Sequence, residues 1–535
     1  MKPRRAHKAR PNRRHMGLRY LPAAAIVIFA AVLLKNAWLS DDAYITFRSV
    51  DNFVSGYGLV YNVGERVQSY THPLWMLSLS LIHFATREFY YTTIIFSVVI
   101  TLGTVHFFFK LSTRAAALSG LVVLLASKAF VDYSTSGLEN PLSHLLVVVF
   151  LCYLFGAKAR KATPLLLATI AAVAALNRLD TLAIYLPVLT LIAAQIGWKR
   201  SLPVILFGLS PLFVWTFFSL LYYGAAVANP AYSKLATGIP AGALMQQGLF
   251  YYLNSLTQDP LTLVAITAAC VTVSIRRDVR ELAVMAGVLL YLFYIVRVGG
   301  DFMSGRFFSV PLTASAVLLA RGMADAGRRR FVIFYVAVAA LAMLSARSHL
   351  LSGPGYGDVP LVQTRFFGPL PLSLIDEHGI SDERAFYYQA TGLLRPGGGS
   401  VPDHQWVSQG LDASRAGARV HEFYTLGFTG FYAGRGVHVI DPNGLNDFLI
   451  ARLPIAKYSR WRIGHFTRKI PEGYTDSVSS GHNVITDPGL ARYYDIATLI
   501  TRGDLFAEGR MTAIWKINTG VYDHLIDSYM RNAEQ

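Results

Sequence analysis

The stretch Asp41-Asp42-Ala-Tyr-Ile-Thr-Phe-Arg48 comes just after an apolar segment, residues 20–38, and this junction decides the fold class. As a helix rising about 1.5 Å per residue, the segment is just long enough to cross a hydrocarbon core of roughly 30 Å. Basic residues precede it, so the positive-inside rule predicts a cytoplasmic N-terminus and two carboxylates on the opposite side. Adjacent acids repel each other, which favours a functional role over the alternative, a solvated acidic loop.

The composition predicts a polytopic membrane protein. Of the 535 residues, 53% are hydrophobic and 15% charged, and the mean hydropathy is +0.39, which is too apolar for a soluble chain of this length. The net charge of +17 comes largely from basic clusters in short loops between apolar runs, such as residues 158–161, 199–200, 276–280 and 328–330. This pattern indicates topology and anionic-lipid contact and excludes nucleic acid as a partner. Both cysteines, Cys152 and Cys270, lie in apolar runs and are predicted to pack in the core.

The apolar runs predict eleven membrane helices. They lie near residues 20–38, 89–109, 114–131, 141–156, 162–176, 181–196, 201–223, 260–275, 281–297, 307–321 and 331–346. The shorter run 71–86 is interpreted as an amphipathic helix on the membrane surface, because a crossing there moves the basic loops to the outside.

Three parts of the chain follow from this assignment. Residues 1–19 form a basic cytoplasmic N-terminus, and residues 20–348 form a transmembrane module with a first outer loop at 39–88. Residues 349–535 contain no run that spans a bilayer, and we expect a soluble α/β domain on the same outer face. Within it, residues 419–441 predict a strand, a helix and a second strand.

Polar clusters in the predicted outer loops supply the candidate site residues. Ser136-Gly-Leu-Glu139 places an acid at a helix mouth, where capping is the alternative role. Asn177-Arg178-Leu-Asp180 breaks two apolar runs with both charges, for which an internal ion pair is the structural alternative. Lys234 and the run Gly299-Gly-Asp301-Phe-Met-Ser-Gly-Arg306 add cations and flexible backbone.

Two further clusters lie in the tail. Asp441-Pro-Asn443-Gly-Leu-Asn-Asp447 and Gly464-His465-Phe-Thr-Arg468 place polar groups on short turns. Neither has the ligand spacing of a metal site.

Taken together, these motifs resemble the GT-C class of membrane glycosyltransferases. The similarity is closer to the terminal arabinofuranosyltransferases of actinobacterial cell walls and their relatives, which include a flagellar motor control family. It rests on the Asp41-Asp42 loop, Gly-Glu-Arg66, Tyr70-Thr-His-Pro-Leu-Trp75, Ser136-Gly-Leu-Glu139, Tyr223-Gly224, the 299–306 run and the two tail motifs. The resemblance implies a GT-C-like fold and arabinofuranose transfer from a decaprenyl-phosphate donor.

The expected reaction is inverting sugar transfer. Asp41 or Asp42 is the expected base, and the choice between them stays open. The donor phosphate and sugar are assigned to His72, Glu139, Arg178, Lys234, Asp301 and Arg306, and the acceptor side or soluble domain to Asn443, Asp447, His465 and Arg468. No metal or other cofactor is expected, and a divalent cation at the Asp pair is the alternative.

The expected partners are a polyprenyl-phosphate sugar donor, membrane lipids, and a glycan, lipid or protein acceptor. The location is the cytoplasmic (inner) membrane, with the C-terminal domain periplasmic or extracellular. Two other function classes stay open: a non-catalytic regulator that keeps a GT-C-like scaffold, and a lipid transporter or flippase.

Overall fold

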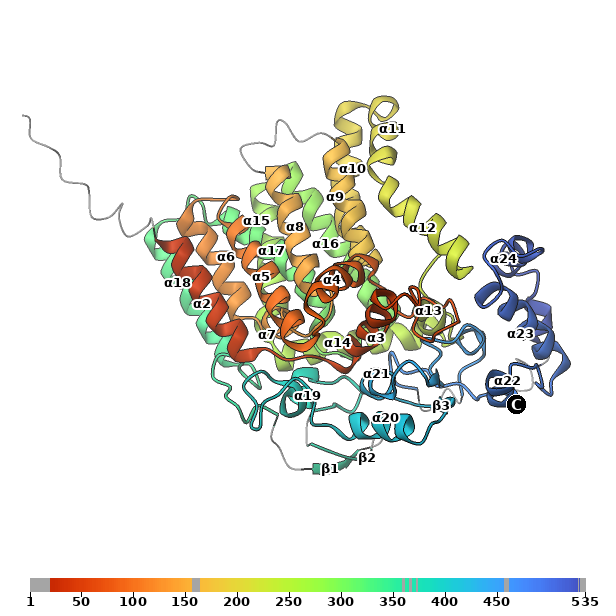
Figure 1. The fold of residues 1–535 in the computed structure, drawn as a ribbon. Coiled ribbons are helices and arrows are strands. Elements are labelled where there is room, and N and C mark those ends of the chain that lie inside the picture. The colour runs from red at the N-terminus through yellow and green to blue at the C-terminus, as the bar shows by residue number, and fades with distance from the viewer. Residues whose placement is uncertain are drawn as a thin grey trace, which may run out of the picture.

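The computed structural model describes residues 20–155, 164–357, 361–364, 368–371, 374–456, 461–527 and 529. A bundle of helices forms the larger part of the molecule, and the part of the chain after residue 348, here called the C-terminal segment, lies along one end of it (Figure 1). The predicted N-terminal region 1–19 and the basic loop 158–161 lie outside the described residues.

Each of the eleven apolar runs folds as a helix, or as two helices separated by a bend. These are α2 (Leu21–Asn36), α5 (Tyr90–Phe108), α6 (Arg114–Ala126), α8 (Asn140–Phe155), α9 (Pro164–Asn177), α10 (Leu182–Ile196), α11 (Trp198–Gly208) with α12 (Ser210–Tyr223), α15 (Pro260–Arg276), α16 (Val279–Val298), α17 (Ser309–Gly322) and α18 (Arg328–Met343). Buried Leu, Val, Ala and Phe side chains from these helices form one continuous core. The extra helix α14 (Ala241–Gln258) was not predicted, because Gln246, Gln247 and Asn254 interrupt its apolar pattern.

The helix lengths support a polytopic membrane protein. Three helical stretches among the described residues, 90–108, 179–196 and 279–298, are long and apolar enough to cross a membrane on their own. Three bent pairs pass the same test together, and four shorter apolar helices accompany them. The count of eleven crossings remains a prediction.

Shorter helices lie at the end of the bundle that faces the C-terminal segment. They are α3 (Asp41–Val54), α4 (Pro73–Thr86), α7 (Lys128–Tyr133) and α13 (Asn229–Leu235). Helix α3 turns by 96° from the axis of α2, so it runs across the end of the bundle and does not continue the membrane helix. Helix α4 forms where an amphipathic surface helix was predicted, and its relation to the membrane remains a prediction.

The C-terminal segment is mainly short helices and loops. Its elements are β1 (Leu361–Thr364), β2 (Gly368–Pro371), α19 (Glu383–Thr391), α20 (Gln405–Arg415), β3 (Val420–Glu422), α21 (Phe428–Ala433), β4 (His438–Ile440), α22 (Tyr474–Ser480), α23 (Pro488–Thr501) and α24 (Arg510–Asn518). Strands β3 and β4 pair in parallel around α21, which confirms the strand–helix–strand predicted for 419–441. The α/β class of the whole segment and the domain boundaries remain predictions.

Buried polar contacts join the C-terminal segment to the bundle. The guanidinium of Arg384 donates to Asp132 at 2.6 Å, and Lys128 contacts Asp382 at 3.1 Å. In the first outer loop, the Asn62 amide exchanges two hydrogen bonds with the backbone of Val439. Buried charges need such partners because leaving them unpaired costs several kcal/mol. The two parts therefore pack as one unit in this structure.

Candidate functional site

The Asp pair occupies the first turn of α3. Ser40 caps this helix, since its hydroxyl accepts a hydrogen bond from the Ala43 amide. The Ser40 amide donates to the Ser136 carbonyl at 2.9 Å, which ties the start of α3 to the loop before α8. Carboxylates in a first helical turn are also favoured by the helix dipole. Local capping therefore explains where the pair sits.

The two carboxylates have different surroundings. Asp41 is buried and accepts hydrogen bonds from the backbone amides of Gly427 at 3.2 Å and Phe428 at 2.6 Å, at the start of α21. Burial raises the pKa of Asp41 to about 7, although these two amides oppose the rise. Asp41 thus fastens α3 to the C-terminal segment.

Asp42 faces a cavity and is less buried than its neighbour. Within the described part of the chain, no hydrogen bond involves its carboxylate. Burial raises its pKa, while Lys234 and Arg306 oppose the rise. The cavity lies between the bundle and the C-terminal segment, and its lining includes Asp41, Asp42, Lys234, Phe302, Glu383, Tyr387, Trp406, Asn443, Arg462 and His465.

Cations meet around Phe302, on the 299–306 run. The Lys234 ammonium lies 5.7 Å and the Arg462 guanidinium 5.3 Å from the centre of its ring, and His465 packs edge-on at 4.5 Å. Among the described residues, no carboxylate lies within ion-pair distance of Lys234. This side of the cavity is therefore suited to an anionic group.

Glu139, whose side chain is fully buried, organises a second cluster. Arg178 donates to its carboxylate at 2.6 Å and Arg306 at 3.0 Å, and His72 lies 3.4 Å away. The charges of Arg306 and Arg178 hold the pKa of Glu139 below its usual range in spite of burial, while burial lowers the pKa of His72 to about 4. Four of the predicted donor-site residues, His72, Glu139, Arg178 and Arg306, therefore come together, but both arginines are already paired with a carboxylate.

Arg178 and Arg306 each contact a second acid. Arg178 also binds Asp180 at 2.9 Å, so the structural alternative proposed for this pair is present. Arg306 lies 3.6 Å from Asp301. An oxygen of Asp301 and the Nε of Arg306 are buried and have no hydrogen-bond partner within the described segments. Arg306 is only 8% exposed, so it is not a solvent-exposed loop residue.

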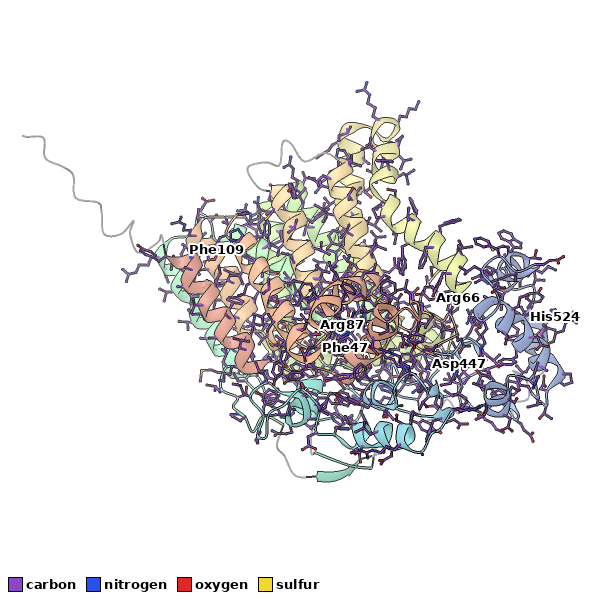
Figure 2. The ribbon with its side chains drawn as sticks, viewed as in Figure 1. Phe47, Arg66, Arg87, Phe109, Asp447 and His524 are labelled. Atoms are coloured by element: carbon purple, nitrogen blue, oxygen red, sulfur yellow. The ribbon has the colours of Figure 1, made fainter. Side chains whose placement is uncertain are left out.

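The four tail residues separate into two groups. Asn443 and His465 line the cavity. Asp447 accepts hydrogen bonds from the Tyr474 hydroxyl and the Ile450 amide, and Figure 2 shows it among the C-terminal elements. Arg468 donates to four backbone carbonyls, including Ser233 at 2.7 Å. Asp447 and Arg468 thus brace loops around the site.

Sequence reasoning missed Glu383, Arg462 and Trp406. Glu383 is buried in the cavity wall, where desolvation raises its pKa to about 8 in spite of the nearby Arg462. Backbone hydrogen bonds of Ser381 to Phe302 and Ser304 place this stretch beside the 299–306 run. No local pattern marks Glu383, because its position depends on this long-range pairing.

A groove continues from the cavity over α20 and β3. The cavity and the groove share Trp406, Tyr424 and Thr425 as lining residues. The groove continues along Gln409, Asp412, His421 and Glu422. Aromatic faces beside amide and carboxylate groups suit the ring faces and hydroxyls of sugars. Among the described residues, no group of three or more His, Cys, Asp or Glu side chains is arranged to hold a metal ion, and independence from a cofactor remains a prediction.

Comparisons with known proteins identify two relatives. The chain is 26% identical to the terminal beta-(1->2)-arabinofuranosyltransferase of Mycobacterium tuberculosis, over 88% of this chain and 87% of that protein. It is 28% identical to the protein of the same name from Corynebacterium glutamicum, over 52% of this chain and 47% of that one. No family model and no solved structure matches.

Proposed function

We propose that this chain, a membrane glycosyltransferase by its homology, transfers arabinofuranose from a polyprenyl-phosphate donor to a hydroxyl of an envelope acceptor. The name of the two relatives suggests the sugar. The observation that carries the site assignment is the Asp42 carboxylate, which has no hydrogen-bond partner among the described residues and faces the same cavity as Lys234. One group is suited to take a proton and the other to compensate a departing phosphate.

The proposed reaction is a single displacement. Asp42 takes the proton of the acceptor hydroxyl, and the resulting oxygen forms a bond to the anomeric carbon of the donor. The bond from that carbon to the phosphate oxygen breaks on the opposite side, which inverts the anomeric configuration. Lys234 and Arg462 stabilise the negative charge on the departing polyprenyl phosphate. Asp41, held by the start of α21, positions the turn that carries the base.

We assign a structural role to the buried cluster around Glu139. Its arginines are paired with carboxylates, so we assign them to positioning the 299–306 run and less to direct phosphate binding. The groove lined by Trp406 and Tyr424 supports a glycan as the acceptor, because its aromatic and polar side chains continue from the catalytic cavity.

A direct assay tests the proposal. Purified protein is incubated with radiolabelled decaprenyl-phosphate arabinofuranose and envelope glycans, with decaprenyl-phosphate mannose as the control donor and with EDTA in a parallel reaction. We expect label in the glycan only with the arabinose donor and an unchanged rate with EDTA. Transfer from the control donor alone contradicts the choice of sugar, and loss of activity with EDTA contradicts the metal-free mechanism.

A further inference from the structure

Helix α24 and the loop before it carry an exposed apolar patch. Phe506 is 82%, Trp515 71% and Met511 51% exposed. Met511 and Trp515 are four residues apart and so share one face of the helix. The opposite face of α24 is buried, since Ala513 and Ile514 pack against Ile500 of α23. The outward apolar side chains are therefore not needed for the core of the C-terminal segment.

This patch lies beside the end of a bundle helix. The Arg510 guanidinium donates to the carbonyls of Leu221 at 2.8 Å and Tyr222 at 3.1 Å, and the Asn518 amide donates to Gly224 at 2.8 Å. Figure 1 shows α24 next to this end of α12. The fit at Gly224 is close, because an added Cβ there comes within 2.1 Å of Ile500. The position of α24 relative to α12 is therefore fixed.

Helix α12 carries its own exposed apolar surface. Together with α11 it is apolar and long enough to form a bent membrane span. Its Phe217 is 70% and Val214 67% exposed, as expected for side chains that face lipid, and the partly exposed Tyr222 lies at its end. Tyrosines are enriched where a membrane helix leaves the hydrocarbon core. A helix fixed to this end therefore lies at the level of the membrane interface.

We infer that α24, with Phe506, Met511 and Trp515, inserts into the interfacial layer of the lipid bilayer beside α12. Aromatic and thioether side chains are suited to this layer, and charged groups around the patch, such as Glu508 and Lys516, can remain among the headgroups. The position of the patch beside the end of α12, a helix whose exposed apolar side chains suit contact with lipid, favours the bilayer over a second copy of the chain or a protein partner.

The contact also connects the membrane surface to the first outer loop. Arg66 donates to the Tyr222 carbonyl at 3.2 Å and to Ile500 at 3.3 Å, and its amide donates to Thr501 at 2.9 Å. Figure 2 shows Arg66 between α12 and the C-terminal helices. A helix α24 held at the membrane interface would therefore stabilise the region where Arg66 of the first outer loop contacts both α12 and α23.

Spin labelling of the full chain in phosphatidylcholine–phosphatidylglycerol nanodiscs tests this inference. A label is attached to Trp515→Cys or, as a matched exposed control, to Ser479→Cys on α22, with Cys152 and Cys270 replaced by serine. Collision with oxygen, which concentrates in lipid, is compared with collision with a water-soluble nickel complex. We expect a higher ratio of oxygen to nickel collisions at position 515 than at 479.

Two outcomes of the spin-label experiment overturn the inference. Equal access of the nickel complex to both positions places the patch in water. Protection of position 515 from both reagents assigns it to a protein contact. Unlabelled protein gives a second measurement, because lipids with bromine near the headgroup should quench more fluorescence in the native chain than in Trp515→Phe. An equal degree of quenching contradicts insertion.

Discussion

At the scale of single residues, the structure separates two neighbouring acids that the sequence presents as equivalent. The Asp41 carboxylate accepts hydrogen bonds from the backbone amides of Gly427 and Phe428, which are 386 and 387 residues away in the sequence. Asp42 instead faces the cavity. No local pattern distinguishes them, because the difference arises from a long-range contact. The same holds for Arg178 and Arg306, whose pairing with the buried Glu139 follows from packing and not from spacing.

The Asp pair gives the first prediction. Asn preserves the size of Asp but does not accept a proton, so Asp42→Asn should lower turnover by about 10²–10⁴-fold and change donor binding much less. Asp41→Asn places an amide NH₂ near two N–H donors, so we expect a lower melting temperature together with a smaller loss of rate. Initial rates, donor binding and thermal unfolding are measured on both variants. If Asp41→Asn instead loses more activity than Asp42→Asn, the base is Asp41. If both variants keep near-normal rates, the non-catalytic regulator is favoured.

Lys234 gives the second prediction. The ammonium lowers a pKa of Asp42 that burial has raised, so Lys234→Met should raise this pKa further. A base acts in its deprotonated form, so activity rises as pH passes its pKa, and this limb of the pH–rate profile should move to higher pH. Donor binding should weaken by about 1.5–3 kcal/mol if a charged hydrogen bond to phosphate is lost. Lys199→Met is the control, because Lys199 is exposed on α11. If Lys234→Met leaves both the pH–rate profile and the donor affinity unchanged, Lys234 is not part of the site.

At the scale of elements, the functional unit is the contact between α3 and α21. Sequence patterns predicted a strand–helix–strand around α21, because Val437-His-Val-Ile440 and the glycines beside the helix are local signals. They did not predict that the start of α21 binds the first turn of α3. Helix positions are encoded locally, but the angle between two helices depends on which surfaces meet, so the 96° turn between α2 and α3 was also not predicted.

Gly427 tests the role of this contact. A Cβ at this position comes 2.0 Å from the Asp41 carbonyl oxygen and 2.4 Å from its carboxyl carbon, so Gly427→Ala should displace α21 from α3. We expect a lower melting temperature and a loss of turnover, although residue 427 is not among those that line the cavity. Gly436→Ala is the matched control, since a Cβ there meets nothing within 4 Å. Equal behaviour of the two variants contradicts the role assigned to this contact.

At the scale of the whole molecule, every apolar run was correctly predicted as helical. A backbone in hydrocarbon satisfies its polar groups most simply in a helix, so composition and run length are sufficient to predict one. Apart from the strand–helix–strand at 419–441, the C-terminal segment was predictable only as a region without spans, because the positions of its short elements depend on contacts with the bundle. Among these, Arg384 binds Asp132 across 252 residues.

Topology gives the last prediction. The turn from α10 to α11, together with the first turn of α11 that carries Lys199 and Arg200, lies at the end of the bundle opposite α19 and α20 (Figure 1). The positive-inside rule assigns that connection to the cytoplasm and the catalytic cavity to the outside. Single cysteines at Lys199 and Ser400, both exposed, report on the two ends of the bundle when Cys152 and Cys270 are replaced. In intact cells an impermeant maleimide should label position 400 and not 199, while permeabilised cells should show both. Labelling of 199 with protection of 400 reverses the orientation and moves the cavity to the cytoplasmic side.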